Sequence, residues 1–124
     1  MNRKQLFELF AEHFGGVPDY PWDEPSDAAV FRHSDNRKWY ALVMNIPSEK
    51  LGIQGNGNID IVNFKCDPAV KGSYLALDGF YTAYHMNKTH WITADIAAAA
   101  DEDILSAAEL SYALTMKKQK PKKK

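Results

Sequence analysis

The segment from residue 38 to residue 46 (KWYALVMNI) constrains the fold of this chain more than any other segment. Successive side chains of a β-strand point to opposite faces of the sheet, and this segment is apolar at both its odd and its even positions. Such a strand is central in its sheet and has other elements packed over its faces. The chain has 124 residues, of which 45% are hydrophobic, and this is enough for one domain around such a sheet.

The other elements follow from apolar periodicity and from the residues that begin helices and turns. Asn2 with Gln5 resembles a capping box, and Asp67 before Pro68 is a typical helix start. The expected helices are residues 2–14, about 68–77 and a last helix that begins near residue 101. The expected strands are residues 29–33, 38–46, 59–66, 80–86 and 89–95.

The predicted fold class is therefore α+β. Short connections favour an antiparallel five-stranded sheet with helices packed on it, in the order α-β-β-β-α-β-β-α. We expect residues 1–116 to form this single domain and residues 117–124 to form a flexible lysine-rich tail.

Two short turns are expected between neighbouring strands. Residues 34–37 (SDNR) are typical of a turn because Asp and Asn bond their own backbone. A tight turn at residues 87–88 would place His85 opposite His90 on one face of the sheet. Two imidazoles can share a metal ion, but a zinc site needs three or four ligands and no third is evident. We therefore expect a structural histidine pair, with no metal and no cofactor.

Catalytic chemistry has no recognisable signature in this chain. The single cysteine, Cys66, cannot form an internal disulfide, and its expected state is buried and inert. The motifs GxSxG, CxxC and HExxH and the P-loop are missing, so we expect a protein that is not an enzyme. The first residues, MNRKQLFELF, lack the long apolar stretch of a signal peptide, and no apolar run approaches the ~20 residues of a membrane helix. The expected compartment is the cytoplasm, without membrane attachment.

The charges of the chain are unevenly distributed. The net charge is −1, with 15 basic and 16 acidic residues, but the last eight residues (KKQKPKKK) contain six lysines and no acid. Residues 1–116 are therefore acidic overall. An acidic body does not attract phosphates in bulk, whereas the lysine-rich tail can do so without any fold. A second interpretation of this tail is a frayed terminus that aids solubility.

Several separated motifs carry a resemblance to a known family. They are YPW (20–22), VFRH (30–33), KWYALVMNIP (38–47), KCDP (65–68), AYHMNKTHWIT (83–93) and SYAL (111–114). In this order, over nearly the whole chain, they resemble the MmcQ/YjbR family of small bacterial proteins. The resemblance implies a CyaY-like α+β fold and a DNA-binding protein of the "double-wing" type. Thr82 stands where this family usually has proline, and alanines 97–99 replace a common Asp-Gly turn, but both departures lie in connections.

The leading hypothesis is a non-catalytic DNA-binding protein that contacts phosphates through two hairpin tips. Lysine and arginine would bind phosphate, and an exposed aromatic ring would stack on a base. A second interpretation of Trp91 is an anchor in the core. The candidate residues are Arg32, Arg37, Lys38, Asn87, Lys88, His90 and Trp91.

Two other functions stay open. The alternative is a domain that binds a small molecule or a protein partner through an aromatic-lined pocket or patch. Its candidate aromatic residues are Trp22, Trp39, Tyr84 and Trp91. An aromatic-lined cavity would favour this alternative, and an exposed basic ridge would favour DNA binding. The third option is an enzyme that uses Cys66 or the histidines.

Overall fold

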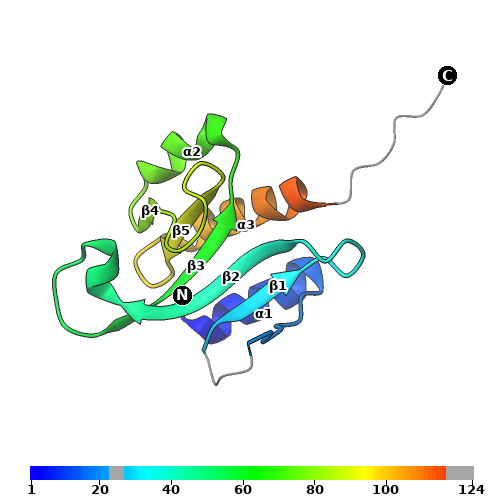
Figure 1. The fold of residues 1–124 in the computed structure, drawn as a ribbon, viewed down its shortest axis with the longest axis horizontal. Coiled ribbons are helices and arrows are strands. Elements are labelled where there is room, and N and C mark those ends of the chain that lie inside the picture. Colours follow the sequence, from blue (N-terminus) through cyan, green and yellow to red (C-terminus); the bar gives the residue numbers. More distant parts are fainter. Residues whose placement is uncertain (23–26, 117–124) are drawn as a thin grey trace.

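Strand β2 (Trp39–Pro47) is the long central strand that its two apolar faces predict. It pairs with β1 (Ala29–Arg32) on one side and with β3 (Asn58–Lys65) on the other. The computed structural model describes residues 1–22 and 27–116. Within them the sheet has five strands in the order β1-β2-β3-β5-β4, and every neighbouring pair is antiparallel (Figure 1). The remaining strands are β4 (Phe80–Thr82) and β5 (Trp91–Asp95).

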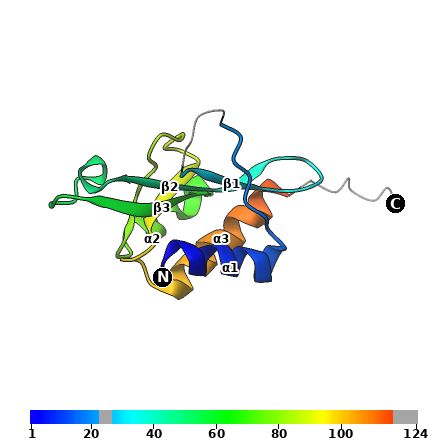
Figure 2. The ribbon, with the colours of Figure 1, turned by 90° about the horizontal axis from the view of Figure 1, so that it is seen from below.

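The helices confirm the predicted α+β class and element order. Helix α1 (Arg3–Phe14) and helix α3 (Asp101–Thr115) lie on the same face of the sheet (Figure 2), and α2 (Pro68–Leu75) contacts the edge strand β4. The connection between β2 and β3 contains a short 3-10 helix, η1 (Ser48–Leu51). The other predicted bounds agree within about two residues, except at β4, which ends four residues earlier than predicted.

The main core lies between the sheet and the two long helices. Phe10 of α1 makes edge contacts with the rings of Phe31, Tyr40 and Phe64, and all four side chains are buried. Ile104 brings α3 into the same cluster. Burial of several large rings in one cluster is the main source of stability in a domain of this size. This cluster joins α1 and α3 to the inner strands of the sheet.

The opposite face of the sheet carries a second, smaller cluster of Val30, Leu42 and Ala28. Met86, from the connection between β4 and β5, packs against it together with Trp39. A long connection therefore covers part of the face that has no helix, and the apolar residues of β2 are covered on both sides.

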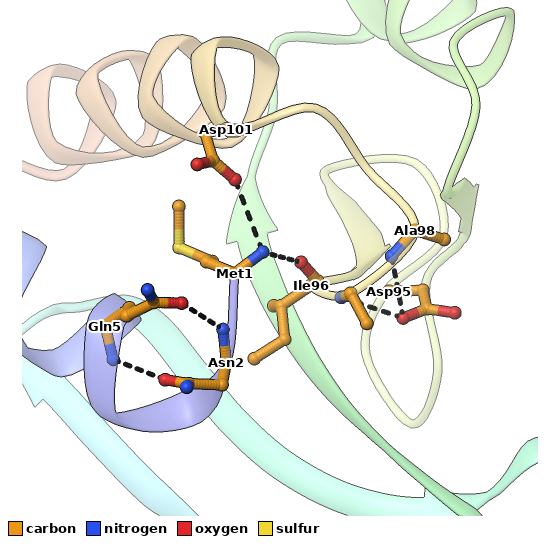
Figure 3. Close-up of polar contacts among 8 residues, drawn as sticks. Met1, Asn2, Gln5, Asp95, Ile96, Ala98 and Asp101 are labelled. Carbon is orange, nitrogen blue, oxygen red and sulfur yellow. Dashed lines mark hydrogen bonds and ion pairs between the residues drawn. The ribbon is translucent and has the colours of Figure 1, made fainter.

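The first helix begins as its sequence predicts. The Asn2 side chain accepts from the Gln5 amide, and the Gln5 side chain accepts from the Asn2 amide, both at 2.8 Å (Figure 3). Beside this capping box, the Met1 amino group donates to the carbonyl of Ile96 at 2.9 Å and lies 3.3 Å from the Asp101 carboxylate. These contacts join the start of α1 to the start of α3.

The prediction of two longer strands joined by a tight turn at residues 87–88 is wrong. β4 ends at Thr82, which lies opposite Ile92, so residues 83–90 form a loop. His85 lies in this loop with φ +56°, and it does not face His90 across a ladder.

Buried side chains account for this difference. The Tyr84 amide donates to the hydroxyl of Thr93 at 2.9 Å, and the Tyr84 carbonyl accepts from the Asn63 side chain at 3.2 Å. The Thr93 hydroxyl in turn donates to Asn63. Side chains of β3 and β5 thus bond the backbone groups that a longer β4 would pair with β5, and the strand ends early.

Candidate functional site

The two predicted tips lie at the same end of the sheet. Ala41, near the start of β2, lies opposite Phe64 near the end of β3, and Phe64 lies opposite Ile92 near the start of β5. The turn at residues 33–38 precedes β2 and the loop at residues 83–90 precedes β5, so both leave the sheet at this end (Figure 1).

Basic side chains gather at this end and acidic ones at the other. We call the first the basic end; its cations are Arg32, Arg37, Lys38, Lys65, Lys71 and Lys88, together with the acids Asp19, Asp35 and Asp67. The opposite end carries the acids Glu49, Asp60, Asp78, Asp95, Asp101, Glu102 and Asp103, together with the cations Arg3, Lys4 and Lys50. The acidic average of residues 1–116 therefore hides an uneven distribution of charge along the strands, with an excess of cations at one end and of acids at the other.

The turn between β1 and β2 is tied to the end of α3. The Asn36 side chain donates to the Thr115 carbonyl at 2.8 Å and accepts from the Lys38 amide at 2.9 Å. The Thr115 hydroxyl donates to Ser111 and accepts from Nε2 of His33 at 2.8 Å. Met116, the next residue, is the last described residue before the lysine-rich segment. Residues 117–124 themselves lie outside the described part of the chain.

Asp19 neutralises part of the charge of this turn. Arg32 and Arg37 share its carboxylate, and Nη2 of Arg37 lies 3.8 Å from Oδ2. Arg32 is half-buried, whereas the Arg37 side chain is 63% exposed and Lys38 is exposed. Of the three cations predicted here, Lys38 and Arg37 are the ones that face solvent.

The second tip, the loop at residues 83–90, is held together by its own polar side chains. The Asn87 side chain accepts from the amides of Thr89 and His90, and the Lys88 ammonium donates to the Ala83 carbonyl at 2.8 Å. The ammonium of Lys71 donates to the Lys88 carbonyl at 2.9 Å. Asn87 is therefore structural, and Lys88 is exposed but bonded to its own loop.

Trp91 does not lie at the surface in the way that base stacking requires. Its ring is only 9% exposed, and the ammonium of Lys65 lies 5.6 Å from the ring centroid. The core-anchor interpretation of Trp91 therefore holds. His90 is exposed, and its carbonyl accepts from the Cys66 amide at 2.7 Å, which joins the loop to the end of β3.

The candidate catalytic groups are not brought together. Cys66 is buried, and burial, followed by the neighbouring Asp67, raises the pKa of its thiol, which disfavours the nucleophilic thiolate. Within residues 1–22 and 27–116, no three histidine, cysteine or acidic side chains are arranged to hold a metal ion. Absence of enzyme activity stays a prediction.

The four aromatic residues proposed for a ligand patch are dispersed. Trp22 meets Trp39 edge-on at 6.2 Å on the face without helices, whereas Trp91 lies beneath Lys65. Tyr84 packs against the neighbouring His85 ring. The predicted patch is therefore not one surface.

A different aromatic-lined pocket lies beside the first tip, and sequence reasoning missed it. We call it the Tyr40 pocket; it has a volume of about 430 Å³ and is lined by residues 14–19, 32–34, Arg37, Tyr40 and Tyr112. These segments come from α1, β1, β2 and α3, so no single motif indicates the pocket. The only local signal is Gly15-Gly16, which follows α1: a Cβ at position 16 would come within 2.3 Å of the Tyr40 hydroxyl.

Tyr40 is the most perturbed group of this pocket. It is 1% exposed, and its hydroxyl has no hydrogen-bond partner among the described residues. Burial, and secondarily the neighbouring Tyr112, raise the pKa of Tyr40 to about 12. The hydroxyl therefore stays protonated and is a potential donor at neutral pH.

Ionisation of Tyr40 is expected to destabilise the fold at high pH. Because its pKa is raised from 10.0 to about 12, the unfolded chain releases this proton between those two values while the folded chain keeps it. The stability contributed below pH 10 is then lost as the pH rises through 12. Relative to Tyr40→Phe, wild-type protein should lose roughly 2 kcal/mol across this window in urea unfolding. Parallel pH profiles for the two proteins would contradict this expectation.

None of the helices within residues 1–22 and 27–116 has the length and apolarity needed to cross a bilayer. Fold and charge distribution define a small α+β protein with one five-stranded antiparallel sheet and a basic end. Residues 14–114 match the model of the YjbR family. The chain belongs to this family, as its motifs predict.

Similar proteins agree with this assignment. YyaQ of Bacillus subtilis (strain 168), described as uncharacterized, is 39% identical over 116 residues, which are 93% of this chain and 98% of that protein. The crystal structure of a Pseudomonas syringae protein is similar with a TM-score of 0.90 and 45% identity, covering 94% of this chain and 100% of the other. The Deinococcus radiodurans protein DR2400, with a DUF419 domain, has a TM-score of 0.66 at 20% identity over 91% of this chain and 77% of its own, which shows the fold alone.

Proposed function

We propose that the protein binds DNA without catalysing a reaction, and that the basic end of the sheet forms the contact surface. The observation that carries the proposal is the common position of both tips and of the last turn of α3. Lys38 and Lys88 are both exposed residues of this end, although the Lys88 ammonium also donates to the Ala83 carbonyl, and the six lysines that follow Met116 add positive charge to the chain. Ammonium groups clustered in this way bind phosphates through charge and counterion release.

The charges of the opposite end support one orientation of binding. Acidic side chains there repel a polyanion, so the duplex would meet the basic end and not the rest of the surface. The two tips carry few groups suited to reading base edges: Trp91 is buried, and the Asn87 side-chain oxygen accepts bonds from its own loop. The proposal is therefore contact with the phosphate backbone and little sequence preference.

A salt titration of duplex binding by the full chain tests the proposal. Affinity should fall steeply as salt rises, and Lys38→Ala should reduce the magnitude of the logarithmic salt slope by about 1. Lys4→Ala is the matched control, because Lys4 is an exposed lysine near the start of α1, away from the basic end. It should leave affinity and slope unchanged.

A full-length variant with all six tail lysines replaced by glutamine separates the tail from the folded surface. Binding at low salt should weaken in this variant but remain, and Lys38→Ala should weaken it further. If the glutamine variant fails to bind any duplex at low salt, the folded domain does not bind DNA.

A further inference from the structure

We propose that the Tyr40 pocket binds a small molecule that carries an oxyanion, either a phosphate or a carboxylate. The anion would lie against the guanidinium groups of Arg32 and Arg37. This inference does not depend on DNA binding, because it concerns a pocket between α1 and the first tip and not the exposed lysines. At about 430 Å³, the pocket has the size of ordinary small-molecule sites.

The charges of the pocket favour an anion. Two guanidinium groups share the single carboxylate of Asp19, so one positive charge is not balanced by this acid. The contact of Arg37 with Asp19 is 3.8 Å long and its side chain is 63% exposed, which makes this pair weak. Arg37 is therefore free to turn toward a ligand, and guanidinium binds phosphate and carboxylate with paired hydrogen bonds.

Two buried donors in the walls lack a partner. Among the described residues, neither the Tyr40 hydroxyl nor Nε of Arg32 has a hydrogen-bond partner, and both residues line the pocket. Buried polar groups in folded proteins nearly always find one. Both groups can donate a hydrogen, and an oxyanion supplies acceptor oxygens. The two donors without a partner therefore favour the same kind of ligand as the unbalanced positive charge does, namely an anion with acceptor oxygens.

The backbone of Arg37 supports a role for its side chain. Its φ is +63°, a left-handed conformation that glycine or asparagine adopts at lower cost. The turn is fixed by the Arg37 amide, which donates to the His33 carbonyl at 3.1 Å, and by the Asn36 side chain. Glycine at position 37 would serve this backbone as well, so the turn itself does not call for an arginine. The side chain reaches back to Asp19 at the pocket.

NMR titration of the full-length ¹⁵N-labelled protein with inorganic phosphate, phenyl phosphate and benzoate tests the inference. Each probe replaces chloride in the buffer, so that the ionic strength stays constant. At least one probe should cause saturable shifts of the Gly15, Gly16 and Arg37 amides. Arg37→Gly, which suits the backbone and should fold, should weaken that binding about tenfold or more through loss of a charged hydrogen bond.

Lys38→Ala is the matched control, since it removes a neighbouring cation that does not line the pocket. Its affinity for the probe should stay within about twofold of wild type, since an exposed charge contributes little. Shifts that do not saturate with any probe, or equal losses in the two variants, would overturn the inference. Displacement of phenyl phosphate by an unphosphorylated duplex would also overturn it, because the bound oxyanion would then belong to nucleic acid. Failure of DNA binding alone leaves this test unaffected.

Discussion

Replacing Gly79 by alanine should lower the free energy of unfolding by about 3 kcal/mol. Gly79 has φ +82°, and a Cβ there would lie 2.5 Å from the backbone nitrogen of Ala99 and 2.7 Å from its Cα. The left-handed conformation costs alanine about 1–2 kcal/mol, and overpacking adds about 1–3 kcal/mol. The clash is with backbone, so rotation of a side chain cannot relieve it. The connection before β4 must then move away from the segment that leads into α3.

Gly52→Ala separates these two costs. Gly52 has nearly the same backbone conformation, with φ +76°, but no atom lies within 4 Å of the position that a Cβ would take. This variant should lose only the conformational part, about 1 kcal/mol. Urea unfolding of the two variants, followed by tryptophan fluorescence, gives the comparison. Equal losses would mean that the contact between Gly79 and Ala99 does not constrain the fold.

The parts of the fold that sequence predicts are those determined by neighbouring residues. The Asn2–Gln5 capping box and the Asp67 cap depend on groups within three positions of each other, and both form as expected. Two apolar faces place β2 at the centre of three strands. The loop at residues 83–90 was not predicted because Asn63, some twenty positions earlier, bonds the backbone that would have extended β4.

In the candidate site, too, local features could be predicted from the sequence and contacts between distant residues could not. Its cations were recognised because they lie next to turn residues, and both turns or loops do leave the sheet at one end. The partners of these cations could not be predicted, since Asp19 meets Arg32 only after β1 has folded against the segment that precedes it. The exposure of Trp91 likewise depends on packing under Lys65. A cation next to turn residues can be recognised in the sequence, whereas the acid that neutralises it is brought near only by folding.

Ser111 connects α3 to the strands that form the basic end. Its hydroxyl, fully buried, donates to the Tyr40 carbonyl at 2.6 Å and accepts from the Lys65 amide at 2.8 Å. One side-chain oxygen therefore satisfies backbone groups of both β2 and β3. Because Thr115 on the same helix holds the first tip, the position of that tip depends on how α3 is seated against the sheet.

Ser111→Ala should lower the free energy of unfolding by about 3 kcal/mol, since it leaves a buried carbonyl and a buried amide without their partner, at about 1–3 kcal/mol each. Ser106→Ala is the matched control on the same helix: Ser106 is exposed, and its hydroxyl lies 2.7 Å from the Tyr74 hydroxyl. It should change stability by no more than about 0.5 kcal/mol. Urea unfolding with equal m-values compares the two proteins. If Ser111→Ala is as stable as Ser106→Ala, the Ser111 hydroxyl does not contribute to holding α3 against β2 and β3.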